Sequence, residues 1–501
     1  MGTEDISRHA TSRPKRYDGV RMQQGRVTTD DDFNEGARLV AEDDRRTRLD
    51  VIGPAGTVDE GFRITNPRIN AHDELDFDIG AGSYYVGGLR AEVNAPGEAY
   101  ATQSDHLQQP PPDRPKPVDG RVDLVYLETW QQPVEAVEDS ELFETALAGP
   151  DTATRVRTMR RVRVAPNVNA SDCTAAWQSQ LAALTATCGQ LDLDTSECVP
   201  DAKLTVTFDT TGVTDDLCSP SIVGGYLGAE NQAVRVQIVD STHFTWGFDN
   251  ASPLYRVTVG ADGVTVTLQT EPRDEAHWMQ SGQIVEILPW SAVLSNGEKI
   301  AEQLGHLSKV ATAYDANTHT LTLATALPAA PFPGFGLQWT TRDDAPALGA
   351  RFFYMRVWGR GGDTTSDPAL TFAPGTPVTL GQTGLRVTLA GTVFVPSDHW
   401  IIAARPEDPT RVVPWELLTG RAPHGVRRFY TPLALITWRV NGNDVTGTRV
   451  SLVTANERSA TRSLSITDTT AVAVLLGSPR ISVRRPHPST VMPVRPSMRK
   501  S

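Results

Sequence analysis

The sequence lacks the segments that membrane insertion or secretion requires. No stretch approaches the roughly 18 to 20 consecutive apolar residues of a membrane-spanning helix. The N-terminal region has no apolar core of the kind found in secretory signal peptides. Although the chain begins Met-Gly, Ile6 stands where a myristoylation site has Ser or Thr. We therefore expect a protein made in the cytoplasm, without a signal peptide and without a membrane span.

Motifs for catalysis and for cofactor binding are also missing. The ten histidines are scattered, with no His-Glu-x-x-His or His-x-His pair, and no Ser or Cys lies in a nucleophile-elbow setting. Gly87-Gly88 indicates a hairpin turn, not a phosphate loop. The best candidate dyad is Asp398-His399, with His424 further along the chain. Because none of these patterns is specific, we predict no enzyme activity, no catalytic residues, no cofactor and no metal.

Glycine, proline and acidic residues are plentiful. The 501 residues include 40 glycines and 35 prolines, which, with 39% hydrophobic residues, favour a turn-rich β protein. A chain of this length is expected to form roughly two to four domains. Its formal net charge of -13 disfavours binding to nucleic acid or to an anionic membrane. We predict a mainly β fold of several small sandwich-like or barrel-like modules, with an N-terminal amphipathic helix and a short helical insertion.

Changes in composition divide the chain into consecutive segments, and the proline-rich run from Gln108 marks the clearest boundary. The predicted segments are an N-terminal docking segment and helix at 1–54, a β module at 55–118, a central β domain at 119–255 with a cysteine-bearing insertion at 167–218, a small barrel-like module at 256–338, a C-terminal β domain at 339–478 and a basic, proline-rich tail at 479–501. The tail has six Lys or Arg and no acid, which is typical of a disordered or partner-bound segment.

The N-terminal helix is the best-defined local prediction. Thr29 or Asp30 can cap it, and the acidic residues at 30–32 suit the positive end of the helix dipole. Gly53-Pro54 ends it. A calcium site in the acidic run is the weaker alternative, because the EF-hand spacing and closing Glu are absent. One face of the helix collects apolar residues: Phe33, Ala37, Val40 and Ala41.

Residues 121–166 form the most strongly patterned stretch. The apolar residues at 122–130 predict a largely buried strand. An acidic connector at 138–144 follows, and then a second strand that carries cations along its length: Arg155, Arg157, Arg160, Arg161 and Arg163. If connector and strand pack side by side, their opposite charges would form an ion-pair network. A solvated edge strand, kept from aggregation by its charges, fits the pattern equally well.

Four cysteines lie in or beside the insertion, at Cys173, Cys188, Cys198 and Cys218. Their spacing contains no Cys-x-x-Cys pair and no nearby His, so zinc binding is weakly supported. Two disulfides are favoured over free buried thiols if the mature protein works outside the cell, because the cytoplasm keeps thiols reduced. The pairing cannot be deduced from the sequence.

Four blocks of sequence resemble an uncharacterised bacterial family whose genes typically lie in clusters for contractile phage-tail-like particles (contractile injection systems), beside baseplate assembly genes. The blocks are YDGVRMQQGRVTTDDDFNEGARL at 17–39, DLVYLETWQQPVEAVEDSELFETALAGPDTATRVRTMRRVRV at 123–164, GGYLGAENQAVRVQIVDSTHFTWGFDNAS at 224–252 and DHWIIAARPEDPTRVVPWELLTGRAPHGVRRFYTPLALI at 398–436. The family typically has Asp-Ala-Asp-Trp-Asn-Glu where this chain has Asp-Asp-Asp-Phe-Asn-Glu at 30–35. It often has Lys-Trp-Ser where this chain has Thr-Trp-Gly at 245–247.

The resemblance implies a structural component of such a particle, at the baseplate or on a fibre or spike attached to it. Other tail and baseplate proteins are then the expected partners, with three-fold or six-fold homo-oligomers and assembly into a particle that can be released from the cell. The N-terminal helix would dock to a neighbouring subunit, and the charged stretch would hold domains or subunits in register. The residues expected to mediate these contacts are Asp31, Phe33, Asn34, Glu35, Glu138, Asp139, Arg155, Arg157, Arg160, Arg161, Trp246 and Trp400.

A tail protein that binds or degrades a cell-surface glycan is the alternative. Exposed tryptophans could stack on sugars, although most tryptophans are expected in cores. The candidates for stacking are Trp246, Trp278, Trp290 and Trp400. A carboxylate pair for glycoside hydrolysis would have to come from Glu128, Glu135, Glu138 and Asp139, a type of cluster that is usually on the surface.

Overall fold

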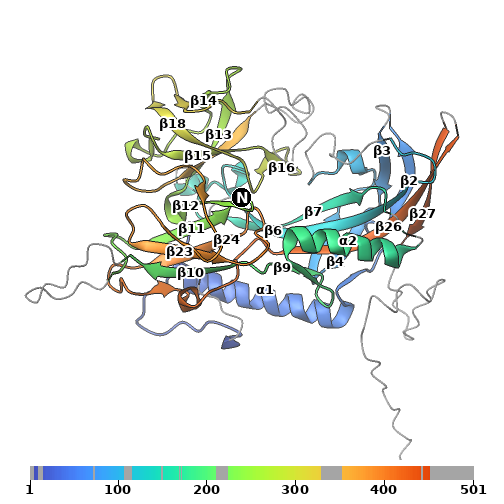
Figure 1. Cartoon of the computed structure of the whole chain (residues 1–501), viewed down its shortest axis with the longest axis horizontal. Coiled ribbons are helices and arrows are strands. Elements are labelled where there is room, and N and C mark those ends of the chain that lie inside the picture. The colour runs from blue at the N-terminus through green and yellow to red at the C-terminus, as the bar shows by residue number, and fades with distance from the viewer. Residues whose placement is uncertain are drawn as a thin grey trace, which may run out of the picture.

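Three β-rich bodies and one long helix make up the structure, a computed structural model that describes residues 5–9, 15–70, 74–105, 116–147, 151–168, 170, 172–209, 224–328, 352–441 and 444–451. Strands account for 41% and helices for 16%, so the predicted mainly β fold is confirmed. In Figure 1 a large sheet with helix α2 lies on the right, a β-sandwich at the lower left and a closed barrel at the upper left. The predicted tail at 479–501 lies outside the described residues. None of the described helices is both long and apolar enough to span a bilayer.

Helix α1 (Asp30–Ile52) forms where the sequence predicts it. The Thr29 hydroxyl accepts a hydrogen bond from the Asp32 amide, and the Asp32 carboxylate accepts one from the Thr29 amide, which together make a capping box. The helix ends where the Gly53 N–H donates to the Leu49 carbonyl at 2.8 Å. Both of its ends are therefore specified by local sequence.

The large sheet joins segments from distant parts of the chain. Its strand order is β7-β6-β26-β9-β8, and β27 also pairs with β26. The bounds are β6 Val122–Val134, β7 Arg155–Ala165, β8 Gln190–Asp192, β9 Glu197–Val199, β26 Arg428–Asn441 and β27 Asp444–Ser451. The two predicted strands of the 121–166 stretch pair antiparallel, as β6 and β7. The other neighbour of β6 is β26, with Tyr430 in register with Glu128, so the 119–255 and 339–478 segments share one sheet.

Two small sheets cover one face of β6. Their strands are β1 Ala55–Thr57, β4 Gly82–Val86 and β5 Leu89–Val93 in one sheet, and β2 Ile64–Ile69 and β3 Leu75–Ile79 in the other. Val125 and Leu127 of β6 join their core, together with Phe429 and Trp438 of β26. Because β6 is apolar on both faces, each face needs a cover. The segment expected as a separate module at 55–118 therefore shares its core with C-terminal residues.

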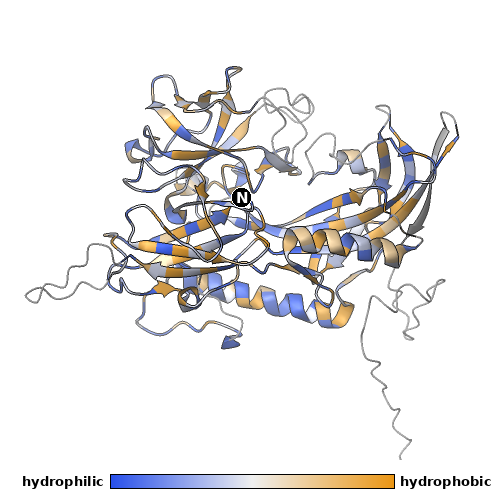
Figure 2. Cartoon of the chain, in the orientation of Figure 1, coloured by the Kyte–Doolittle hydropathy of each residue, from blue (hydrophilic) through white to orange (hydrophobic). Residues whose placement is uncertain are grey.

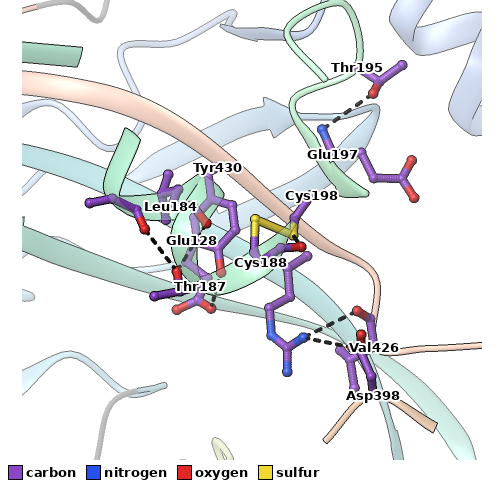
Figure 3. Close-up of a disulfide and its surroundings, with 12 residues drawn as sticks. Glu128, Leu184, Thr187, Cys188, Thr195, Glu197, Cys198, Asp398, Val426 and Tyr430 are labelled. Carbon is purple, nitrogen blue, oxygen red and sulfur yellow. Dashed lines mark hydrogen bonds and ion pairs between the residues drawn. A yellow bond between two sulfur atoms is a disulfide. The ribbon is translucent and has the colours of Figure 1, made fainter. Parts of the chain in front are cut away.

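Helix α2 (Cys173–Cys188) covers the other face of β6 and is followed by the β8–β9 hairpin. Figure 2 shows α2 as largely hydrophobic, whereas α1 alternates between hydrophilic and hydrophobic residues. A disulfide joins Cys188 to Cys198 and so ties the end of α2 to β9, close to Tyr430 of β26 (Figure 3). Cys173 is buried, and Cys218 lies outside the described residues. Among the residues that the structure describes, one of the two disulfides considered from the sequence is thus present.

The β-sandwich packs a five-stranded sheet, in the order β21-β12-β11-β24-β25, on a three-stranded sheet, in the order β10-β23-β22. The bounds are β10 Lys203–Phe208, β11 Gln232–Ile238, β12 His243–Phe248, β21 Leu370–Thr371, β22 Pro377–Thr379, β23 Leu385–Ala390, β24 His399–Ala404 and β25 Val412–Val413. Strand β10 falls within the predicted insertion at 167–218, yet it pairs with β23. Strand pairing thus crosses this sequence-based boundary too.

The closed barrel has the strand order β13-β14-β19-β18-β15-β20. Its strands are β13 Leu254–Val259, β14 Thr265–Leu268, β15 Ile284–Leu288, β18 His306–Asp315, β19 Thr320–Leu323 and β20 Phe353–Trp358. The hairpin of β16 (Trp290–Val293) and β17 (Lys299–Ala301) packs between the barrel and β6–β7. The barrel extends past the predicted boundary at residue 338, because β20 closes it against β13 and β15. Short 3₁₀ helices are η2 Tyr100–Thr102, η3 Ser140–Leu142, η4 Thr145–Leu147, η5 Asp249–Ala251, η6 Glu275–His277 and η7 Trp415–Leu418.

Candidate functional site

Helix α1 is fixed to the molecule by charged side chains at its N-terminal end. Asp31 is fully buried, and its carboxylate pairs with Arg8 Nε at 2.6 Å and with Arg38 Nη2 at 3.1 Å. Asp31 was expected to contact a partner, but it is an internal anchor in this structure. Asn34 and Glu35 are half-buried on the same helix. The inward face of α1 is therefore polar.

A second anchor holds α1 near its C-terminal end. Arg45 is 4% exposed and donates from Nη1 to the Gly87 carbonyl at 2.6 Å. Gly88 lies in the turn between β4 and β5. A Cβ there would lie 2.2 Å from the Arg45 carbonyl oxygen, so this turn can approach the helix so closely only with glycine at this position. Burial alone would raise the pKa of Glu42, but hydrogen bonds and charge from Arg45 and Arg427 lower it well below its ordinary value.

The outward face of α1 exposes several apolar side chains, together with the carboxylate of Asp44. Phe33, Val40 and Val51 are 72%, 58% and 68% exposed. They lie seven and eleven residues apart, which places them on one face of a helix with 3.6 residues per turn. The preceding segment adds Met22 and Val27, which are also exposed. We call Met22, Val27, Phe33, Ala37, Val40, Ala41 and Val51 the α1 strip.

The arginines of β7 pair inside the molecule, and not with the acidic connector. The pairs are Arg157 with Asp105 at 2.7 Å, Arg160 with Glu98 at 2.6 Å, Arg161 with Glu302 at 2.5 Å and Arg163 with Glu128. Arg161 also lies over the Trp130 ring, 4.8 Å from its centroid. Burial would raise the pKa of Asp105, yet Arg157 and Arg160 keep it below its ordinary value. Arg155 alone among the five is exposed, and it donates to the carbonyls of residues 153 and 154.

The acidic connector turns away from β7 toward the β16–β17 hairpin. Glu138 is fully buried and accepts hydrogen bonds at 2.8 Å from the Glu135 and Ala301 amides, and burial raises its pKa. Asp139 accepts a hydrogen bond from Asn296 at 3.0 Å. The prediction that this connector faces the arginines is wrong, because backbone amides from β17 and from the connector itself satisfy Glu138. The solvated-edge alternative is wrong for Arg160, which is 6% exposed.

Trp246 and Trp400 lie in the sandwich core and are fully buried. Both are in register with Val236 of β11, from the neighbouring strands β12 and β24. Trp400 Nε1 donates to the Arg421 carbonyl at 2.8 Å. Trp290 is 2% exposed. These three residues were expected as sugar-stacking candidates, but they are packing residues here.

The Asp398-His399 pair does not form a catalytic dyad in this structure. The Asp398 carboxylate pairs with Arg428 Nη1 at 3.3 Å, whereas His399 Nδ1 lies 3.3 Å from the Ser397 carbonyl oxygen. Burial raises the pKa of Asp398 to about 7 and lowers the pKa of His399 well below its ordinary value. His424 Nδ1 is occupied by the amide of residue 401 at 3.0 Å. Each group is thus committed to a structural contact.

The N-terminal residues 5–9 are held between α1 and the sandwich. The Ser7 amide donates to Asp30 at 2.8 Å, and the Ser7 carbonyl accepts from Arg405 Nη2 at 2.7 Å. The His9 ring packs against the His424 ring with 4.7 Å between centroids. Burial, with Arg38 and Arg421 nearby, lowers the pKa of His9 to about 3. Residues 5–9 therefore help to fix the inward face of α1 to the sandwich.

One pocket opens at the edge of the barrel, with a volume of about 270 Å³. Trp278 is half-buried there, with its ring centroid 6.1 Å from that of Tyr314, whose hydroxyl lies 3.1 Å from His319 Nδ1. The lining residues are Glu271, Pro272, Asp274, Glu275, Trp278, Tyr314, Ala316 and His319. Of these, sequence reasoning picked out Trp278 alone. The one further signal was the acidic run that precedes it in EPRDEAHW.

Metal binding has no candidate among the residues that the structure describes, since no three His, Cys, Asp or Glu side chains are grouped to hold an ion. The model of a family of unknown function, DUF6519, matches residues 3–197. The matched residues include α1, β6, β7 and α2. Neither a curated protein nor a solved structure matches the chain.

Proposed function

We propose that this protein is a structural component of a contractile, phage-tail-like injection particle, at the baseplate or on a fibre or spike attached to it. The observation that carries the proposal is the α1 strip, a set of exposed apolar side chains on a helix that ion pairs to the buried Asp31 carboxylate hold in place. Apolar surface of this kind favours burial against another protein. The setting comes from the four sequence blocks that resemble a family from contractile-particle gene clusters.

The chemistry around the α1 strip indicates what kind of partner would fit it. Asp43 and Asp50 are exposed beside the strip, and Asp44, which pairs with Arg48 at 3.6 Å, is exposed on the same face between Val40 and Val51. The basic residues of the helix are engaged: Arg38 pairs with Asp31, and Arg46 pairs with Glu42 at 3.1 Å. A partner would therefore present an apolar centre with a basic rim, because like charges across an interface are unfavourable. In a three-fold or six-fold assembly, such a partner can be a baseplate protein or another surface of a second copy.

Particle purification tests the proposal. Particles from cells that carry the gene cluster should contain this protein in a fixed ratio to sheath and tube proteins when measured by quantitative mass spectrometry. Val40→Asp should remove the protein from particles, because it replaces an apolar contact by a second carboxylate one turn from Asp44. Leu227→Asp is the matched control, since Leu227 is 69% exposed on the sandwich. Absence of the wild-type protein from intact particles would contradict the proposal, as would equal incorporation of both variants.

Binding or degradation of a cell-surface glycan is the second candidate, and the half-buried Trp278 in the barrel pocket favours it over no ligand at all. An aromatic ring beside carboxylates is a usual sugar-binding combination, because the ring stacks on the sugar and the carboxylates accept hydroxyl hydrogen bonds. A glycan array probed with the full chain should then show binding that Trp278→Leu abolishes. Turnover of the bound glycan would separate an enzyme from a lectin.

A further inference from the structure

The barrel pocket is built from two loops that are fastened to each other. One wall comes from residues 271–278, between β14 and β15, and the other from the β18–β19 turn. The Tyr314 amide donates to the Met279 carbonyl at 2.9 Å, and the Leu268 amide donates to the His319 carbonyl at 2.9 Å. His319 holds a left-handed backbone, with φ of 55°. The pocket is therefore preformed, which lowers the cost of binding a ligand.

The pocket is also strongly acidic. Three carboxylates line it, from Glu271, Asp274 and Glu275. Asp274 caps η6 and lies 2.7 Å from His277 Nδ1. Within the described residues, the exposed Glu271 and Glu275 carboxylates have neither a hydrogen-bond donor nor an ion-pair partner. Two unpaired carboxylates thus share the pocket lining with the Trp278 and Tyr314 rings.

We propose that this pocket binds an organic cation, the ammonium or guanidinium head of a lysine or arginine side chain or of a free amine of similar size. A cation over the Trp278 ring gains from the negative face of its π system. Glu271 and Glu275 would add charge-assisted hydrogen bonds, which are stronger than neutral ones. A sugar could donate hydroxyl hydrogen bonds to Glu271 and Glu275 but would leave their negative charges uncompensated, so the observations favour the cation over the glycan as the ligand of this pocket. The inference rests on the barrel alone and does not depend on the proposed particle role.

Calorimetric titration of the full chain at low salt tests this inference with matched ligands. N-acetylarginine amide and n-butylammonium should bind. N-acetylcitrulline amide, which replaces the guanidinium by a neutral urea of the same shape, should bind at least about tenfold more weakly. The tripeptide acetyl-Gly-Arg-Gly-amide separates the two sources: tighter binding than N-acetylarginine amide indicates a protein side chain, and equal binding indicates a free cation.

Variants test the assigned residues. Glu271→Gln with Glu275→Gln should weaken cation binding about tenfold, whereas Glu141→Gln with Glu407→Gln, which removes the same charge from exposed acids elsewhere, should change it less than about twofold. Trp278→Leu should weaken binding about fivefold and Trp278→Phe should largely preserve it. Thermal unfolding checks that each variant is folded. Equal binding of the citrulline and arginine ligands would overturn the inference, as would binding of a neutral disaccharide in place of the cations.

Discussion

Helix α1 and strand β7 both carry arginines into the interior, but their partners come from different places. Arg45 of α1 pairs with Glu42, three residues earlier in the same helix. On β7, the carboxylates that pair with Arg157 and Arg160 lie 52 and 62 residues away in the chain. The helix leaves the α1 strip facing outward, whereas the strand is buried or half-buried after its first two residues.

The comparison indicates that β7 holds the fold together, whereas α1 displays a surface to the outside. The β7 pairs join the segment around residues 98–105, the β6 strand and the end of β17 to one strand, so they hold separate parts of the molecule together. The α1 pairs fix the helix to the segments around Arg8 and Arg427, and its outer face contributes little to the core. Damage to β7 should therefore affect folding, and damage to the α1 strip should affect association.

The largest expected effect is at Arg160. Arg160→Ala removes the guanidinium that binds both oxygens of Glu98, at 2.6 and 2.7 Å, and leaves a largely buried carboxylate unpaired. We expect a loss of about 3 to 5 kcal/mol in the free energy of unfolding, measured by urea denaturation. Arg155→Ala, on the same strand but exposed, should cost less than about 0.5 kcal/mol. Similar losses of unfolding free energy in the two variants would contradict the view that the inner arginines of β7 differ from those of an ordinary charged edge strand.

Charge reversal at Arg160 and Arg161 extends this test to assembly. With both residues changed to Glu, Glu98 and Glu302 would each face a like charge at a buried position. The variant is expected to fail at folding, before any step of particle assembly. A folded variant that enters particles normally would contradict the architectural role of β7.

Asp31 should have the next largest effect. Asp31→Asn weakens two charge-assisted contacts at once, to Arg8 and Arg38, so a loss of about 2 kcal/mol is expected. Residues 5–9 should also exchange amide hydrogens faster, because Arg8 links them to the helix. Asp43→Asn is the control, as an exposed acid on the same helix. Unchanged exchange in Asp31→Asn would show that other contacts, such as Ser7 with Asp30, suffice.

The elements with local signals could be predicted from the sequence. The cap at Thr29 and the stop at Gly53 specify α1, the apolar run at 122–130 predicts β6, and the arginine-bearing stretch at 155–163 predicts β7. The partners of those elements could not be predicted. Strand β6 requires two neighbours and two covers, but no local pattern shows that β26, some 300 residues later, supplies one of them. This is why consecutive segments looked like separate modules.

The candidate site shows the same division. From local charge we predicted that the acidic connector faces the arginines of β7. Glu138 instead accepts hydrogen bonds from backbone amides of β17 and of its own turn. The exposure of a tryptophan also depends on tertiary packing: Trp246 and Trp278 have similar local surroundings of short strands and turns, yet one is in a core and the other lines a pocket. Helix α1 had a recognisable apolar face, but the sequence did not say that this face points outward.

Acid should weaken the docking of residues 5–9 against α1 and the sandwich. The pKa of His9 is about 3 in the structure against 6.5 for an ordinary histidine, so docking of residues 5–9 favours the neutral ring. Its contribution is full above pH 6.5 and falls as pH decreases toward 3; at pH 5 about 2 kcal/mol is lost. Amide hydrogen exchange of residues 5–9, corrected for its intrinsic pH dependence, should therefore show less protection at pH 5 than at pH 8. His9→Leu should lose most of this difference, and a wild-type segment equally protected at both pH values would contradict the assignment.

The smallest expected effect on stability is at the α1 strip, and it makes the comparison with the interior most direct. Phe33→Ser replaces a side chain that is 72% exposed, so the free energy of unfolding should change by less than about 0.5 kcal/mol. Phe62→Ala, at a fully buried phenylalanine in the core beneath β6, should cost about 3 to 5 kcal/mol. If a partner covers the strip, Phe33→Ser should weaken association although it hardly changes stability, because it removes contact area while leaving the fold intact. Full stability together with full particle incorporation of Phe33→Ser would show that the strip is not where the partner binds.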